Sequence, residues 1–245
     1  MSYPYYIGRI NKNIFEPPKY YLRTLINNTT IWETTDLLNP KIFGELIFSE
    51  SIIESIICCY ELKSLKILWQ LDTSKIFGDL KLSRFIGVHQ NILLVGLGTT
   101  TDVDNYIVAI NIDTGEIIWK VKTSIIQHVL IDKRNNMLRS IISKYYFEVD
   151  IFTGKLSKIK YKDVDEDFNS QRTNFVQVDS HLITTDWKKG KIGAFNTETH
   201  QFDWLHEEEG LTFPGGSPML YKAPYLFVQD NKHTVHVFEK INQNT

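Results

Sequence analysis

The side chains with the most obvious chemical potential in this chain of 245 residues are two adjacent thiols, Cys58 and Cys59. They are the only cysteines, and two neighbours can neither staple distant segments nor complete a zinc site. The seven histidines are scattered. His233 and His236 are three positions apart, so on one strand they point to opposite faces and do not form a ligand pair. We therefore expect no metal site from these residues.

The familiar catalytic motifs do not occur either. The sequence has no HExxH, no GxSxG, no P-loop and no GxGxxG that follows a strand. Gly96 and Gly98 end an apolar strand with no helical pattern behind them. We expect a protein without catalytic residues or a bound cofactor.

Acidic runs and one tryptophan are the remaining candidates for a functional surface. The acids are Asp102, Asp104, Asp163, Asp165, Glu166, Asp167, Glu207, Glu208 and Glu209. Such runs are typical of solvated loops, and the alternative is an acidic patch that attracts a basic partner. Trp187 is flanked by Lys188 and Lys189 in a connecting turn; it either anchors an interface or packs on its own strands. The Gly/Pro-rich segment 210–218 is either a binding loop or a plain connector.

A repeated hairpin predicts the elements that position these residues. Residues 106–123 read YIVAINIDTGEIIWKVKT, in which an alternating strand, an Asp-Thr-Gly turn and a second strand with Trp119 follow one another. The same hairpin recurs at 59–73, 145–161 and 192–205, and in weaker form at 20–34. The residues that correspond to Trp119 are Trp32, Trp69, Ser157 and Trp204.

The spacing of the repeat indicates a β-propeller. The marker positions recur about every 37 to 50 residues, the range of propeller blades. A second echo, KIFGEL at 41–46 and KIFGDL at 75–80, follows two of the marker tryptophans. Two more strands precede the hairpins, most clearly at 84–90 and 92–98. The sequence thus predicts one all-β domain, residues 1–245, built from four-stranded blades.

The landmarks divide the chain into six units, with five blades as the alternative. The units are 1–36, 37–73, 74–123, 124–161, 162–208 and 209–245. The last unit contains only three strands, and an open sheet edge is a liability. We therefore expect an N-terminal strand, residues 5–10, to complete the final blade and close the ring. In such a ring the acidic segments open on one face.

The pattern x-x-Asp-x-x-Thr-Gly-x-x-x-Trp resembles the repeat of the pyrroloquinoline-quinone (PQQ) quinoprotein family and its non-catalytic relatives. The resemblance is strong at 109–123 and weaker in the other copies. It implies a propeller in which the tryptophan packs between neighbouring blades, and it does not by itself imply a function.

Enzymes of that family have two adjacent cysteines beside the cofactor, which raises the question of Cys58 and Cys59. The repeat places both in the outer part of a blade, whereas a cofactor would lie on the propeller axis. Free cysteine is also a common small core residue. The calcium ligands and aspartate base of the family cannot be assigned here, so the chain resembles a non-catalytic member. The alternatives are a quinoprotein-type enzyme and a scaffold for a membrane-associated assembly.

Composition and charge limit the remaining function classes. Lys plus Arg total 27 and Asp plus Glu 29, so the formal charge of -2 gives no field that attracts nucleic acid or anionic membranes. The first ten residues do not look like a secretion signal, which predicts a cytoplasmic protein. We expect a monomeric, intracellular, protein-binding propeller. The narrower hypothesis is an immunity protein whose acidic face neutralises a basic toxin domain.

Overall fold

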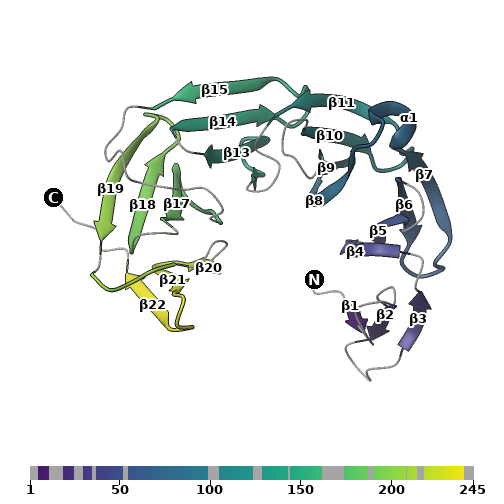
Figure 1. The fold of residues 1–245 in the computed structure, drawn as a ribbon, viewed down its shortest axis with the longest axis horizontal. Helices are drawn as coiled ribbons and strands as arrows, with labels where there is room; N and C mark the ends of the chain where they lie inside the picture. The colour runs from purple at the N-terminus through teal and green to yellow at the C-terminus, as the bar shows by residue number, and fades with distance from the viewer. Residues whose placement is uncertain are drawn as a thin grey trace. The chain divides into compact units, whose positions relative to one another are not determined.

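β-Strands make up almost all regular structure in the computed structural model (Figure 1). It describes residues 5–10, 19–24, 30–34, 37–51, 55–98, 105–123, 129–142, 144–161, 174–186, 190–207, 209–213 and 218–239. The chain divides into two compact units, residues 1–124 and 125–245. We describe each unit by itself.

The first unit contains three antiparallel sheets, each made of strands that follow one another along the chain (Figure 1). The first sheet consists of β1 (Tyr5–Ile10), β2 (Lys19–Thr24) and β3 (Thr30–Thr34). The second consists of β4 (Leu37–Phe43), β5 (Leu46–Ser51), β6 (Ile56–Glu61) and β7 (Ile67–Asp72). After the short helix α1 (Ser74–Phe77), the third consists of β8 (Lys81–His89), β9 (Ile92–Gly98), β10 (Tyr106–Asn111) and β11 (Ile117–Lys122).

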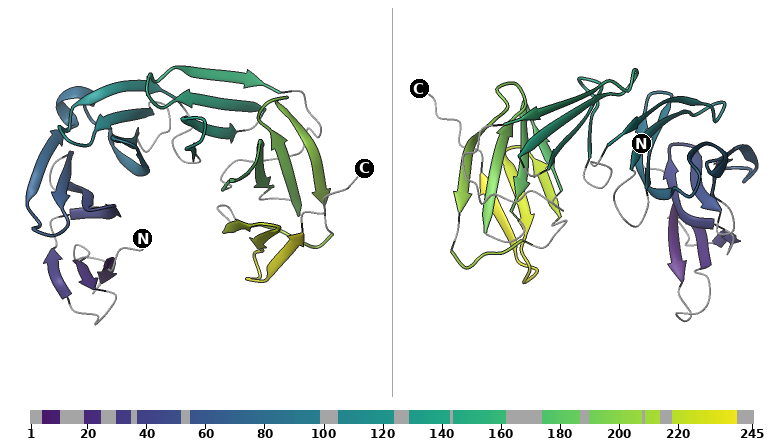
Figure 2. Two further views of the ribbon diagram at one scale, coloured as in Figure 1. Left: turned by 180° about the vertical axis from the view of Figure 1, so that it is seen from behind. Right: turned by 45° about the horizontal axis from the view of Figure 1, so that its top comes forward.

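The second unit repeats this plan, and the two views of Figure 2 show its sheets from other directions. The fourth sheet consists of β12 (Leu130–Asp132), β13 (Met137–Ile142), β14 (Tyr145–Asp150) and β15 (Leu156–Lys160). The fifth consists of β16 (Val176–Val178), β17 (His181–Thr185), β18 (Lys191–Asn196) and β19 (Gln201–Glu207). The sixth consists of β20 (Met219–Lys222), β21 (Tyr225–Gln229) and β22 (Val235–Glu239).

These sheets confirm the predicted blades, and six of them are present, not five. Each predicted unit contains one sheet, with every boundary in the connection between two sheets. Four sheets have four strands, and among the described residues the first and the last have three.

The N-terminal strand takes a different place from the expected one. Residues 5–10 pair along their whole length with β2 and so belong to the first sheet, not to the last. Pairing with a nearby strand closes a short loop, which costs less chain entropy than pairing with the opposite end of the chain.

Each marker tryptophan lies on the last strand of its sheet beside a β-bulge. Trp32, Trp69, Trp119 and Trp204 pair with Leu22, Cys59, Ala109 and Ala194, and in each case the register shifts by one residue at the next position. Ser157 pairs with Glu148 at the same place without a shift. The hairpin that has Ser157 in place of the tryptophan therefore also lacks the extra residue of the bulge. A bulge changes the direction of the side chain beside it, which is how it orients the tryptophan in the other hairpins.

Trp69 shows what this geometry achieves. Its indole Nε1–H donates to the carbonyl oxygen of Ile112, and its ring covers Gly115 in the turn between β10 and β11. The side chain is 8% exposed and belongs to a core shared by the second and third sheets. The expectation that the tryptophan packs between neighbouring blades is confirmed for this pair.

In the fourth sheet, which has Ser157 in place of the marker tryptophan, a tyrosine ring packs against the next sheet. Tyr146 of β14 lies with its ring centroid 5.4 Å from that of His200, in the turn between β18 and β19 of the next sheet. His200 has a positive φ of 57°, and Gly115 has a φ of 75° at the corresponding turn position. Tyr146 thus covers the turn that a tryptophan at position 157 would otherwise cover.

The hairpin turns are held by a repeated polar residue at the end of the third strand. Asn111, Asp150 and Asn196 each accept hydrogen bonds from the backbone N–H groups two and three residues later. This Asx turn is a local device, since the side chain replaces a backbone acceptor. It explains why Asp and Asn recur in the repeat although the following residues vary.

Gly115→Ala is expected to destabilise the protein more than Gly210→Ala. Both glycines have a positive φ, 75° and 80°, so both substitutions put a Cβ on backbone that favours glycine. A Cβ at Gly115 would lie 2.7 Å from the Trp69 ring, whereas one at Gly210 meets nothing within 4 Å. We expect the Gly115 variant to lose about 1–3 kcal/mol more in free energy of unfolding, as overpacking does. Urea denaturation measures the difference, and equal losses would contradict the contact.

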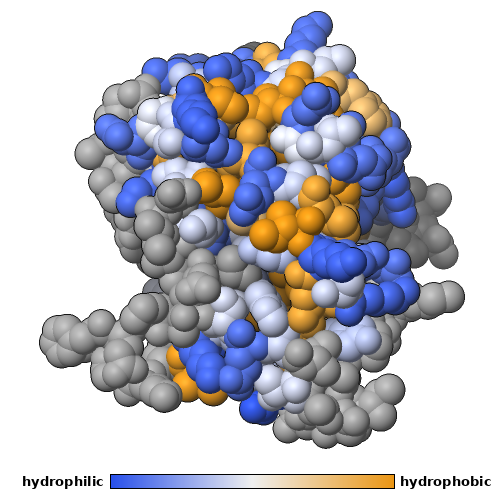
Figure 3. Space-filling view, turned by 90° about the vertical axis from the view of Figure 1, so that its right-hand side faces the viewer, coloured by the Kyte–Doolittle hydropathy of each residue, from blue (hydrophilic) through white to orange (hydrophobic). Residues whose placement is uncertain are grey.

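Several exposed apolar residues lie on the last strand of the second sheet and on the helix that follows it. Figure 3 shows orange side chains among blue ones on the side of the molecule that carries β7 and α1. The exposed apolar residues of these two elements are Ile67, Leu68 and Ile76. Leu68 is the bulge residue before Trp69, so its exposure follows from the bulge.

Candidate functional site

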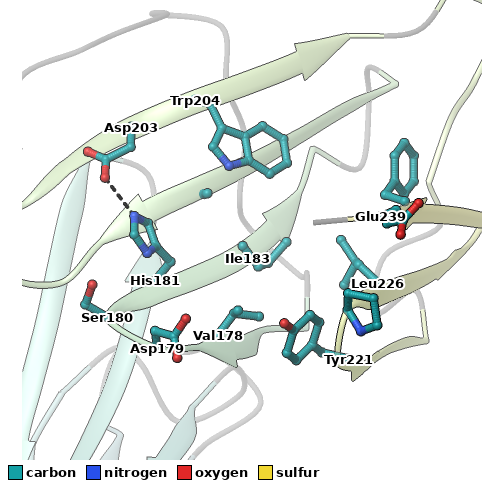
Figure 4. Close-up of a pocket in the computed structure, with 13 residues that line it drawn as sticks. Val178, Asp179, Ser180, His181, Ile183, Asp203, Trp204, Tyr221, Leu226 and Glu239 are labelled. Atoms are coloured by element: carbon teal, nitrogen blue, oxygen red, sulfur yellow. Dashed lines mark hydrogen bonds and ion pairs between the residues drawn. The ribbon is translucent and has the colours of Figure 1, made fainter. Parts of the chain in front are cut away.

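An apolar groove lies between the fifth and sixth sheets, inside the second unit (Figure 4). Its volume is about 520 Å³, within the range of pockets that hold ligands or inserted side chains. The lining residues are Val178, Asp179, Ser180, His181, Ile183, Ala194, Asp203, Trp204, Tyr221, Pro224, Leu226, Phe238 and Glu239.

Strand alternation explains why the walls are apolar. Val178, Ile183 and Ala194 project from the fifth sheet into a core that also contains Leu226 and Val228 of the sixth. Successive residues of a strand point to opposite faces, so every second residue of β21 and its neighbours faces this core. The groove is the part of the inter-sheet core that stays open to solvent.

Trp204 forms one wall of the groove, and Figure 4 shows it on the far side of Ile183 from Tyr221. It is 43% exposed, although it occupies the same repeat position as Trp69, which is 8% exposed. Trp69 is covered because it packs on the turn that follows the third strand of the next sheet. The described part of the sixth sheet ends with its third strand, at Glu239, and so provides no such turn for Trp204.

The rim of the groove is negatively charged. Asp203, the bulge residue before Trp204, accepts hydrogen bonds from Asn196 at 3.0 Å and from His181 Nε2 at 2.7 Å. The Asn196 bond, followed by that of His181, holds the pKa of Asp203 below its usual range, so the carboxylate stays charged at neutral pH. Asp179 and Glu239 add two more acids, and the described lining residues include no Lys or Arg.

Only two of the predicted partner-binding residues lie in the described part of the chain. Glu207 is at the end of β19, where its carboxylate is 3.2 Å from the ammonium of the nearly buried Lys191. That ion pair gives Glu207 a partner within its own sheet. Glu209 is exposed in the turn that follows. Outside the described residues lie Asp102, Asp104, Asp163, Asp165, Glu166, Asp167, Trp187 and Glu208.

The Gly/Pro-rich segment and the two C-terminal histidines have structural contacts. Phe213 is buried and packs in the core beside the groove, with Leu211 against it, which fits a connector at that end of the segment. The prediction that His233 and His236 share a strand is wrong, because His233 lies in a turn and only His236 is on β22. His236 Nε2 is 3.0 Å from a carboxylate oxygen of Asp230, which caps the same turn.

The two cysteines are buried and unpaired with each other. They lie on β6, the third strand of its sheet, and Cys59 is opposite Trp69. Burial, with a smaller effect from Cys58, raises the pKa of the Cys59 thiol to about 12. A thiol with this pKa is protonated at neutral pH and is a poor nucleophile, so the core interpretation suits Cys59.

Two further observations concern the described residues alone. They contain no cluster of three or more His, Cys, Asp or Glu side chains arranged to hold a metal ion. They also contain no helix with the length and hydropathy needed to span a membrane.

The repeat identifies Trp204 as a blade marker, and the structure confirms that position, but the repeat carries no information about the groove. The exposure of Trp204 depends on what lies next to it in space.

Solved structures with this fold come from proteins of several kinds, although no family model and no curated protein sequence matches the chain. Hsv2 of Kluyveromyces lactis matches 93% of this chain and 70% of its own, with a TM-score of 0.65 and 13% identity. A europium-containing methanol dehydrogenase matches 92% of this chain and 59% of its own, with a TM-score of 0.66 and 11% identity. Quinohemoprotein alcohol dehydrogenase from Comamonas testosteroni matches 87% and 48%, with a TM-score of 0.60 and 10% identity. These likenesses, which include PQQ-type dehydrogenases, establish the β-propeller fold.

Proposed function

We propose that the chain is a non-enzymatic β-propeller that binds another protein, and that the groove between the fifth and sixth sheets receives an apolar side chain of that partner. The observation that carries this proposal is the exposure of Trp204, 43% against 8% for Trp69 at the same repeat position. The groove beside it has a volume of about 520 Å³.

An exposed tryptophan beside an apolar groove is the usual chemistry of an interface anchor. Tryptophan is enriched among the few residues that supply most of the binding energy at interfaces, and these residues sit in pockets that lose water on binding. Tyr221 and Phe238 also line the groove, so an inserted side chain would be enclosed by aromatic rings from both sheets. An exposed apolar surface that is rimmed by polar groups is typical of an interaction site.

The charge of the rim favours a basic partner. Asp179, Asp203 and Glu239 surround the apolar surface, and the whole chain has a formal charge of -2. Acidic residues around an apolar anchor steer a positively charged partner and select against acidic ones. The acidic segments at 102–104 and 163–167, with Trp187, remain further candidates for contact with such a partner. The narrower proposal is an intracellular immunity protein that binds a basic toxin domain.

Trp204→Ala is expected to weaken capture of the partner by about 30-fold or more, the effect of losing a hot-spot residue worth about 2 kcal/mol. Ile118→Ala is the matched control, because Ile118 is 44% exposed on β11, in the other unit. The measurement is quantitative affinity capture from the source organism, followed by titration of the captured protein against both variants.

The proposal requires one basic protein that is retained by the Ile118 variant and lost by the Trp204 variant. Equal retention by both variants would remove the groove from the interface. Copurification of a quinone chromophore with dye-linked oxidation of an alcohol would favour a quinoprotein-type enzyme instead.

A further inference from the structure

Within the described residues, β22 (Val235–Glu239) is an unpaired edge of the sixth sheet, at a place where the other sheets of the second unit continue with a fourth strand. β20 lies beside β16, as β8 lies beside β4 in the first unit, so β20 is the first strand of its sheet and β22 the third. The corresponding third strands, β6, β10, β14 and β18, each pair on both sides. Within the described residues, β22 pairs only with β21.

The face of the sixth sheet that is turned away from the groove also leaves apolar surface in solvent, because Val235 and Val237 alternate along β22 with Phe238, which lines the groove. Val235 and Val237 of β22 are 54% and 55% exposed, whereas the interior of β10 is fully buried. Val237 continues a row across the sheet, since Phe227 pairs with it on one side and with Leu220 on the other. Leu220 is itself 62% exposed. Exposed apolar strands with free backbone groups are templates for strand pairing.

We propose that β22 accepts an extended segment of the partner as the fourth strand of the sixth sheet, and that this segment alternates apolar and basic side chains. The inference rests on the proposed protein-binding function and specifies its mode. Backbone hydrogen bonds to the edge of β22 would supply affinity, and alternate side chains would supply specificity, as in other cases of β-strand addition.

The groove and the open edge form one continuous surface. Phe238 and Glu239 of β22 line the groove together with Trp204, so a strand beside β22 would pass next to the indole ring. Its inward-facing apolar side chain would cover Trp204, as the turn of the third sheet covers Trp69. The acids that surround the groove supply the complement for basic residues: Glu239 lies on β22, and Asp203 is held ionised by Asn196 and His181.

A peptide with the sequence of this protein's own fourth strand can test the proposal. Residues 115–123, GEIIWKVKT, include β11 (Ile117–Lys122), the last strand of the third sheet, and end in alternating apolar and basic side chains. Binding is measured by calorimetry, and hydrogen–deuterium exchange locates the contact. We expect saturable binding with slowed exchange over 230–239. The same peptide with proline at its Ile118 and Lys120 positions should not bind, because proline cannot complete a strand ladder.

Val237→Lys tests the edge without touching a buried residue. A lysine there should weaken the basic peptide by about tenfold through like-charge repulsion, as edge lysines do. A peptide with Lys120→Glu and Lys122→Glu should regain affinity for this variant while binding the unaltered protein less well. Ile118→Lys, on β11 of the first unit, is the matched control and should leave both affinities unchanged.

Failure of this inference is distinguishable from failure of the proposed function. Peptide binding without protection of 230–239, or no binding at all, would overturn strand addition. So would a natural partner that depends on Trp204 but ignores Val237→Lys, and that result would leave the groove as the binding site. Loss of Trp204 dependence would overturn the proposed function itself.

Discussion

Trp69→Ala is expected to lower the free energy of unfolding by about 3–5 kcal/mol, the range for truncating a buried large aromatic residue. The substitution leaves a cavity against Phe48, whose ring centroid is 6.0 Å from that of Trp69. It also leaves the carbonyl of Ile112 without the indole N–H that binds it. Because the ring covers the turn at Gly115, the loss weakens the packing between the second and third sheets. Urea denaturation followed by circular dichroism measures the change.

Trp204→Ala is the matched comparison, since the residue type and the repeat position are the same. Its ring is 43% exposed, so we expect a loss of about 1 kcal/mol or less. The two variants thus separate stability from binding: one should unfold easily, and the other should stay folded and lose its partner. Equal destabilisation by both would mean that Trp204 is packed as tightly as Trp69, and the groove would lose its significance.

The blade boundaries could be predicted because they depend on local chemistry. Each hairpin is defined by an Asx turn and by the apolar alternation around it, at Asn111, Asp150 and Asn196. Both features act within about ten residues, so the sequence alone is enough to predict them. The bulge beside each tryptophan was not predicted. It is nevertheless encoded, because Trp119 is four positions after Gly115 and Ser157 is only three positions after Gly154.

The two similar hexapeptides at 41–46 and 75–80 show that similar sequence need not mean the same local structure. KIFGEL spans the end of β4, a turn and the start of β5, whereas KIFGDL contributes three residues to helix α1 and then a turn. Lys41 pairs with Phe48 across a sheet, while the start of α1 is held by Asp72, which accepts hydrogen bonds from the backbone and hydroxyl of Ser74. Similar hexapeptides adopt different structures here because their flanking partners differ.

The groove could not be predicted from local pattern because it depends on a neighbour. Trp69 and Trp204 have the same local hairpin, and they differ only in whether a turn of the next sheet lies above the ring. An acidic residue that is easy to find in the sequence need not be available to a partner. Glu207 belongs to an acidic run, but in the structure its carboxylate forms an ion pair with Lys191.

Arg139→Met is expected to destabilise the second unit by about 3–5 kcal/mol, because it leaves the buried carboxylate of Asp132 without its cationic partner. Arg139 is 7% exposed on β13, and its Nε lies 2.9 Å from a carboxylate oxygen of the fully buried Asp132. Its Nη1 also binds Glu148 and the Tyr146 hydroxyl. Adding Asp132→Asn should recover part of the loss, since asparagine keeps an acceptor for the N–H groups of Arg134 and Asn135. Denaturation of the two single variants and the double variant gives the coupling energy.

The pH dependence of the Arg139→Met effect identifies Asp132 as the stranded charge. Burial alone would raise the pKa of Asp132, but hydrogen bonds from Asn135 and Gln177, with the charge of Arg139, hold it below its usual range. The stability contributed by this carboxylate is therefore complete above an ordinary aspartate pKa of about 4 and is lost as the pH falls through the lower folded value. Arg139 is one of several groups that lower the pKa of Asp132, so its removal raises the folded pKa while the hydrogen bonds from Asn135 and Gln177 remain. The gap in stability between the two proteins must then narrow as the pH falls through the folded pKa of Asp132 in the variant, and a gap independent of pH into the acid range would assign the loss to packing.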